Sequence, residues 1–174
     1  MRFNLRPVIL LLACCVPQPA FAVETIVADQ SAVEAAFLYN FALFTEWPDL
    51  PADEFKICVL GSDPVLAALE PVKKKQIKDR PVSITKISVS AQAQSCQVLF
   101  VGRSEHASIA KLANQIGTAP ILVVSMENGY DPKNVIIELV ALQGRISFKI
   151  NRTAAQANSL TVSSKLLKLA QQVY

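Results

Sequence analysis

The sequence predicts an α/β fold with a mainly parallel central sheet, helices on both faces and an antiparallel edge hairpin near the C-terminus. Strand-like and helix-like segments alternate through residues 55–125, which is typical of parallel α/β sheets. Two of the strand-like segments, CQVLFV and PILVVS, are apolar throughout, as expected for strands that are covered on both faces. Near the C-terminus, two strand-like segments are separated only by Gln143-Gly144, which indicates the hairpin.

The first predicted element is a helix of residues 31–45. Ser31 and Glu34 have the spacing of a capping box, so we expect the helix to begin at Ser31. Pro48 disfavours helical dihedral angles at Trp47, so the helix should end shortly before it. We interpret its apolar face as core, with a ligand slot as the alternative. That face is formed by Val33, Phe37, Phe41 and Phe44.

The other elements follow in order, each bounded by a recognisable signal. Pro64 favours the start of a helix and Gly117 the end of one, while Ser163 is a good N-cap for the last helix. In that last helix we expect Leu166, Leu167, Ala170 and Val173 to face inward. Strands are expected at 55–60, 82–89, 96–101, 120–125, 135–142 and 145–150, and helices at 65–70, 109–116 and 153–158 and after residue 163.

Residues 1–22 resemble a cleavable signal peptide. Arg2 and Arg6 precede an apolar run from Val8 to Val16, and Ala20-Phe21-Ala22 has the pattern of a cleavage site. The run is too short to span a bilayer, which takes about 20 residues. An alternative is a lipoprotein signal with lipidation at Cys14. Residues 23–174 are then expected to form a single domain in the periplasm.

Charge gives no reason to expect a nucleic-acid partner. The chain has 17 Lys and Arg against 14 Asp and Glu, and the signal segment contains two of the arginines. A mature net charge of about +1 lacks the basic excess that is typical of nucleic-acid-binding domains. The one basic cluster, at Lys73-Lys74-Lys75, is interpreted as a solvated helix end.

Two cysteines, Cys58 and Cys96, remain after signal removal, and each lies in an apolar strand-like segment. In an oxidising compartment such thiols tend to pair, so we predict a Cys58–Cys96 disulfide between neighbouring strands. Two buried free thiols are the alternative.

Residues suited to catalysis are sparse. His106 is the only histidine, and no Asp, Cys or Glu stands at metal-ligand spacing from it. Nucleotide-binding and nucleophile-elbow motifs are absent, so we expect no enzyme activity, no metal and no cofactor. Arg103 lies in a turn at the expected carboxyl ends of the strands, where open α/β sheets bind ligands, and could hold an anion.

Four segments resemble the YfiR family, also called YfiR/HmsC-like. They are AAFLYNFALFTEWP, FKICVLGSDP, CQVLFVG and ISFKINRTAAQANSLTVSSKLLKLA. The resemblance implies a periplasmic α/β protein that dimerises and represses an inner-membrane diguanylate cyclase (YfiN-like) by binding its periplasmic domain. This lowers cyclic di-GMP and biofilm formation. It also implies that an OmpA-like outer-membrane lipoprotein can sequester the regulator. The mature chain has one cysteine pair where some members have two.

The leading hypothesis is therefore a protein that regulates a membrane enzyme by binding one of its states better. The partner or ligand surface is expected to involve the turn Glu46-Trp47-Pro48 and the last helix with Lys165, together with Asn151 in the family-like F-x-I-N pattern. The alternative for each residue is a role in packing. A periplasmic small-molecule binding protein is the second hypothesis, and a small hydrolase is the third.

Overall fold

The computed structural model describes residues 22–88, 90–127, 132–142 and 144–174. The predicted signal segment up to residue 21, with Cys14, lies outside the described residues. So do Asn128, Gly129 and Tyr130 of the turn after residue 125, and Gln143 of the predicted hairpin turn.

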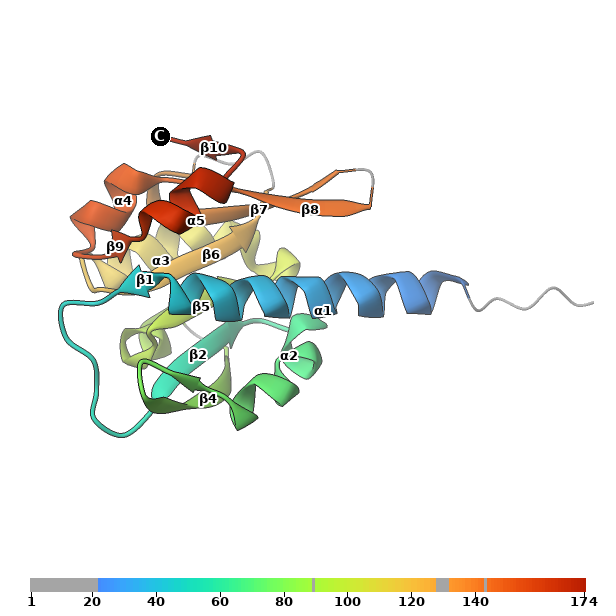
Figure 1. Cartoon of the computed structure of the whole chain (residues 1–174), viewed down its shortest axis with the longest axis horizontal. Coiled ribbons are helices and arrows are strands. Elements are labelled where there is room, and N and C mark those ends of the chain that lie inside the picture. Colours follow the sequence, from blue (N-terminus) through green and yellow to red (C-terminus); the bar gives the residue numbers. More distant parts are fainter. Residues whose placement is uncertain (1–21, 89, 128–131, 143) are drawn as a thin grey trace, which may run out of the picture.

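An eight-stranded sheet forms the centre of the molecule, in the order β10-β8-β7-β6-β5-β2-β4-β3 (Figure 1). The five consecutive strands from β7 to β4 are parallel, and β7 pairs with β8 in an antiparallel hairpin. This confirms the predicted α/β sheet with its antiparallel hairpin. The strands of this sheet are β2 (Phe55–Leu60), β3 (Gln76–Ile77), β4 (Arg80–Ile87), β5 (Val98–Val101), β6 (Leu122–Met126), β7 (Ile137–Leu142), β8 (Arg145–Ile150) and β10 (Gln172–Val173).

Helices cover both faces of the sheet, and alternate side chains of the central strands enter two separate cores. On β2, Ile57 and Val59 belong to the larger core, whereas Cys58 and Leu60 belong to the smaller one. The larger core lies under α1 (Ala22–Leu43), α2 (Val65–Ala68), α4 (Arg152–Ala157) and α5 (Ser164–Leu169). The smaller core lies under α3 (Ile109–Ile116). Short 3₁₀ helices are η1 (Glu70–Lys74), η2 (Ser90–Ser95), η3 (Arg103–Ser108) and η4 (Pro132–Asn134).

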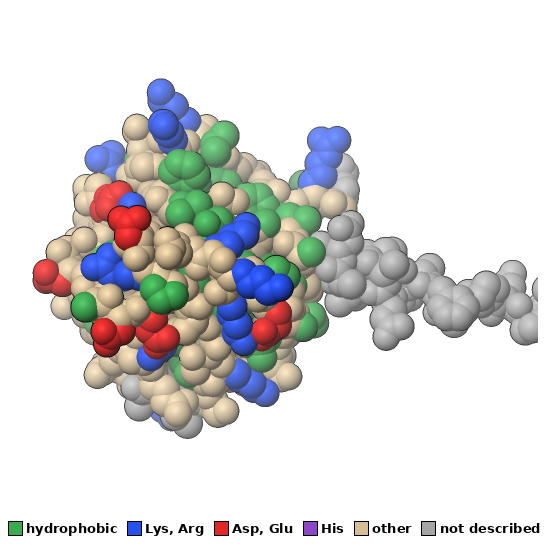
Figure 2. Space-filling model, turned by 60° about the horizontal axis from the view of Figure 1, so that its bottom comes forward, with side chains coloured by type: hydrophobic (Ala, Val, Ile, Leu, Met, Phe, Trp, Pro, Cys, Tyr) green, Lys and Arg blue, Asp and Glu red, His purple; other side chains and the backbone are tan. Residues whose placement is uncertain are grey.

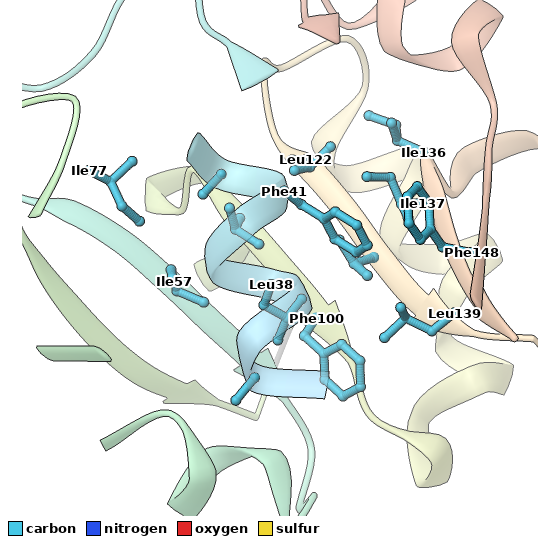
Figure 3. Close-up of a cluster of buried hydrophobic side chains, with 14 of the residues drawn as sticks. Leu38, Phe41, Ile57, Ile77, Phe100, Leu122, Ile136, Ile137, Leu139 and Phe148 are labelled. Atoms are coloured by element: carbon cyan, nitrogen blue, oxygen red, sulfur yellow. The ribbon is translucent and has the colours of Figure 1, made fainter. Parts of the chain in front are cut away.

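The larger core is centred on the second half of α1. Leu38 and Phe41 are fully buried, and Phe41 meets Phe148 of β8 edge-on at 5.0 Å between ring centroids. Figure 3 shows these side chains over Ile57, Phe100 and other apolar residues of the sheet. The aromatic residues of the first predicted helix therefore serve mainly as core.

Two predictions for this first helix are wrong. The helix begins at Ala22 rather than Ser31, because no residue between them breaks it, and Ser31 is a buried residue inside it. Val33 does not share the buried face; its exposed fraction is 40%. The buried stripe instead includes Glu34, Ala35, Leu38, Phe41 and Ala42.

Predicted helix ends are confirmed where a specific residue marks them. Gly117 adopts a φ of +55° directly after α3, and the Ser163 hydroxyl accepts a hydrogen bond from the Leu166 backbone N–H at the start of α5. The last helix is shorter than expected, because the chain extends after Leu169 and Val173 lies in β10, exposed. Strand β10 pairs with β8 outside the hairpin, so the hairpin is next to the sheet edge.

A disulfide joins Cys58 of β2 to Cys96, which lies two residues before the start of β5. The two Cα atoms are 5.9 Å apart, and both residues are buried in the smaller core. Strands β2 and β5 are paired neighbours, so the predicted bond and the adjacency that it required are both confirmed.

Candidate functional site

The order of the strands creates a switch point between β2 and β5. From β2 the chain moves to β4 on one side and then returns to β5 on the other side. Open α/β sheets commonly bind ligands beyond the carboxyl ends of the strands at such a point. The loops that follow β2 and β5 here contribute Asp63 and Arg103, as the sequence predicted for Arg103.

Carboxylates of the protein itself surround Arg103. Its Nη2 donates to Glu34 Oε1 of α1 at 2.5 Å, and Nη1 lies 3.7 Å from Asp63 Oδ2. Glu34 is fully buried, whereas 42% of the Arg103 side chain is exposed. Gln30 also donates to Glu34 Oε1, but Glu34 Oε2 is buried with no hydrogen-bond partner among the described residues. Two carboxylates against one guanidinium give this cluster an excess of negative charge, which disfavours an added anion.

The loops beneath this cluster are closely packed. Asp63 Oδ1 accepts from the Val65 backbone N–H at 3.0 Å, and Oδ2 accepts from the Arg103 backbone N–H at 3.3 Å. A Cβ at Gly102 would lie 3.0 Å from the Leu60 carbonyl oxygen and 3.1 Å from the Asp63 Cβ. A side chain at position 102 would push these neighbouring atoms away by a few tenths of an ångström, so glycine suits the close approach of the two loops. Asp63 thus links the loop after β2 to the loop after β5.

The other predicted surface residues lie at the opposite end of the sheet. Strand β1 (Thr45–Glu46) pairs with β9 (Thr161–Val162), which brings the Glu46 turn next to the start of α5. Glu46, Pro48 and Lys165 are exposed there, and Glu46 pairs with Lys78 at 2.5 Å. The structure therefore brings these three residues into one region and separates them from Arg103.

Two of the predicted residues of that region are part of the folded interior. Trp47 is buried, and its indole packs edge-on against Phe55 at 5.1 Å between ring centroids. Asn151 is also buried, and its Oδ1 accepts from the Ala154 backbone N–H at 2.8 Å as the N-cap of α4. Through these contacts, the side chains of Trp47 and Asn151 have structural roles in the folded protein.

A shallow apolar groove of about 380 Å³ lies on the outer face of α1. Its lining residues are Ala32, Val33, Ala36, Phe37 and Asn40. No charged side chain lines it, and Val33 is among the most exposed large hydrophobic residues. Figure 2 shows hydrophobic side chains gathered on one face of the molecule, next to a line of lysine and arginine side chains. This small apolar face of α1 is a candidate surface for a protein contact.

A second buried carboxylate, Glu138 of β7, lies opposite Lys149 of β8. Burial raises the pKa of Glu138, while the charge of Lys149 opposes that shift. The hydrogen bond from Lys149 to Glu127 raises the pKa of Lys149. The Lys149 ammonium group therefore interacts with two carboxylates, those of Glu127 and Glu138.

Groups of side chains for metal binding do not occur in the part of the chain that the structure describes. Among those residues, no three His, Cys, Asp or Glu side chains come together as metal ligands. The side chain of His106 lies outside the description. Within the described ranges, no helix combines the length and apolar character needed to cross a membrane.

Sequence reasoning missed three carboxylates: Glu34, Asp63 as a partner of Arg103, and Glu138. Glu34 was interpreted as part of a capping box, although its position on the stripe of Leu38 and Phe41 was a usable signal. No sequence pattern distinguished Glu138 from a surface residue.

Comparison with solved structures gives distant matches. A conserved domain protein from Vibrio cholerae aligns with a TM-score of 0.57 and 14% identity, covering 82% of this chain and 60% of that chain. The ABC domain in complex with L-Trp from Streptococcus pneumonia aligns with a TM-score of 0.50 and 12% identity, covering 69% of this chain and 55% of that chain. At these identities the likeness concerns the fold alone, and this chain matches about three fifths of the length of each.

Two comparisons by sequence complete the assignment. Proteins of curated function gave no match. The profile of the YfiR/HmsC-like family, in contrast, matches residues 31–171, from the buried part of α1 to the last residue before β10. The predicted resemblance is thereby confirmed, and the chain belongs to the YfiR/HmsC-like family.

Proposed function

We propose that this protein is a periplasmic regulator that binds the periplasmic domain of an inner-membrane diguanylate cyclase and represses it. Repression lowers cyclic di-GMP and biofilm formation. The observation that carries the proposal is membership of the YfiR/HmsC-like family over residues 31–171. Binding that favours one state of the enzyme by about 1–3 kcal/mol would change its output between several-fold and about a hundredfold.

Several features of the molecule support an interaction protein. The carboxyl ends of the sheet, where a ligand would be expected, are closely packed around Asp63 and Arg103. An uncharged apolar face of α1 is exposed instead. At the other end of the sheet, Glu46 and Lys165 form an accessible polar region. Because the protein has two such surfaces, we also propose that it forms a homodimer and that it binds a second partner, an OmpA-like outer-membrane lipoprotein.

The first test is intracellular cyclic di-GMP in a deletion strain and in the same strain complemented with the gene. We expect deletion to raise cyclic di-GMP and complementation to reverse the rise. Complementation with a Lys165→Glu variant tests the polar region beside β1 and β9. Its matched control is Lys111→Glu, which makes the same charge change at an exposed position of α3 on the other face. Unchanged cyclic di-GMP on deletion under several growth conditions would contradict the repressor function.

A small-molecule binding protein is the second candidate, because the groove on α1 has a volume at the lower end of the range for ligand pockets. Such a function predicts a rise in melting temperature when the ligand is added without any protein partner. A screen of amino acids and other small periplasmic solutes that gave no shift would count against it.

A further inference from the structure

We propose that the first half of α1, up to Phe37, is a strap that opens and closes over the β2–β5 switch point, with the Glu34–Arg103 ion pair as its latch. The inference concerns the conformational equilibrium of the isolated protein. It does not depend on which partner or ligand the protein binds.

The two halves of α1 are anchored very differently. In the second half, Leu38 and Phe41 are fully buried, and Phe41 contacts the ring of Phe148. Between residues 30 and 36 the buried side chains are only Ser31, Glu34 and Ala35, which offer little apolar surface. Apolar burial stabilises in proportion to the area removed from water, so residues 30–36 are held weakly by packing. Figure 1 shows this end of α1 projecting beyond the sheet.

Glu34, in this part of α1, forms an ion pair with Arg103, which is 69 positions away in the sequence. The Coulomb attraction of a buried ion pair is largely offset by the desolvation of its charges. Opening the strap returns the Glu34 carboxylate, which is fully buried in the closed state, to water. It also gives a partner to Glu34 Oε2, which has none among the described residues when the strap is closed. The closed state is therefore favoured only modestly over a locally opened one.

Phe37 is the natural limit of the opening. Its ring is half-buried and lies 5.5 Å from the ring of Phe41 and 5.6 Å from that of Phe148. Residues beyond it cannot leave the sheet without exposing the larger core. Opening up to this point exposes Glu34 and releases Arg103, 42% of whose side chain is already exposed in the closed state, so the strap controls the charge that the switch point presents to solutes.

The test is hydrogen exchange, measured by mass spectrometry on peptides that cover residues 31–37, the second half of α1, and strands β5 and β6. In the wild-type protein under native conditions, amides of residues 31–37 should exchange by an opening with a smaller denaturant dependence than those of β5 and β6. Arg103→Met should speed exchange at residues 31–37 by about tenfold or more relative to the change in β6, because it removes the latch. The double variant Glu34→Gln/Arg103→Met, which removes the buried charge as well, should restore part of the protection.

Lys149→Met is the matched control, because it also breaks an ion pair, with Glu127, but away from α1. It should leave exchange at residues 31–37 unchanged. Two results would overturn the strap. One is that, in the wild-type protein, hydrogen exchange of residues 31–37 has the same denaturant dependence as exchange of strands β5 and β6. The other is an increase in the hydrogen-exchange rate of the Arg103→Met variant that is equal in α1, β5 and β6. The wild-type measurement decides the matter even where the Arg103→Met variant fails to fold.

Discussion

Removal of the Cys58–Cys96 disulfide should destabilise the protein by about 4 kcal/mol. The bond closes a loop between cysteines separated by 38 positions, and the loop-entropy relation for that length gives about 4 kcal/mol at 25 °C. For a domain of this size, each kcal/mol corresponds to roughly 2–4 °C in melting temperature, so we expect a decrease of roughly 8–16 °C. Urea unfolding of the double variant Cys58→Ala/Cys96→Ala measures the loss directly.

Reduced wild-type protein is the control, because it keeps both side chains in the smaller core and lacks only the covalent bond. Agreement between the reduced protein and the double variant would assign the loss to loop closure. A larger loss in the variant would add a contribution from packing, since Cys58 is fully buried and Cys96 nearly so. The slope of unfolding against urea should also increase on reduction, because an uncrosslinked unfolded chain exposes more surface. A stability difference below about 1 kcal/mol would refute the loop-closure reasoning.

Three further variants test individual buried groups. Because burial raises the folded-state pKa of Glu138 above its ordinary value of 4.5, its charged form costs stability at neutral pH. Glu138→Gln should therefore have a higher melting temperature than wild type at pH 7, and an advantage that did not shrink below pH 4.5 would contradict this. Asn151→Ala removes the N-cap of α4 and should cost about 1 kcal/mol in denaturant unfolding, whereas Asn151→Asp should retain most of it. Trp47→Ala should cost about 3–5 kcal/mol by loss of a buried aromatic side chain. A cyclic di-GMP defect in Trp47→Phe, with normal stability, would instead give the indole a role in binding.

The sequence was informative wherever an apolar run was bounded by a residue with a strong local preference. Strands β2 and β8 have the predicted limits, and α3 ends where Gly117 adopts its positive φ. The disulfide was predicted from the cysteine count and the expected compartment, because only two cysteines lie outside the predicted signal segment. In each case a local rule and the tertiary structure agree.

The sequence was uninformative where pairing depends on distant segments. Strands β1, β3, β9 and β10 have two residues each, which is too short for any alternation of polar and apolar side chains. The start of α1 was placed incorrectly because Ser31 and Glu34 have the spacing of a cap, while tertiary contacts bury both inside a longer helix. A capping pattern predicts a helix start only if the preceding residues cannot themselves be helical.

The position of Glu34 also bears on the choice between the two proposed functions. In a sheet of this order, a small ligand would be expected at the β2–β5 switch point, where Arg103 could supply a cation. Here the Glu34 carboxylate of α1 already pairs with Arg103. Asp63 accepts hydrogen bonds from the backbone of both adjoining loops. A ligand at this point would have to displace part of α1 or bind next to an excess of negative charge. The exposed surfaces require no such rearrangement, so this arrangement of residues favours the proposed protein partner over a ligand at the switch point.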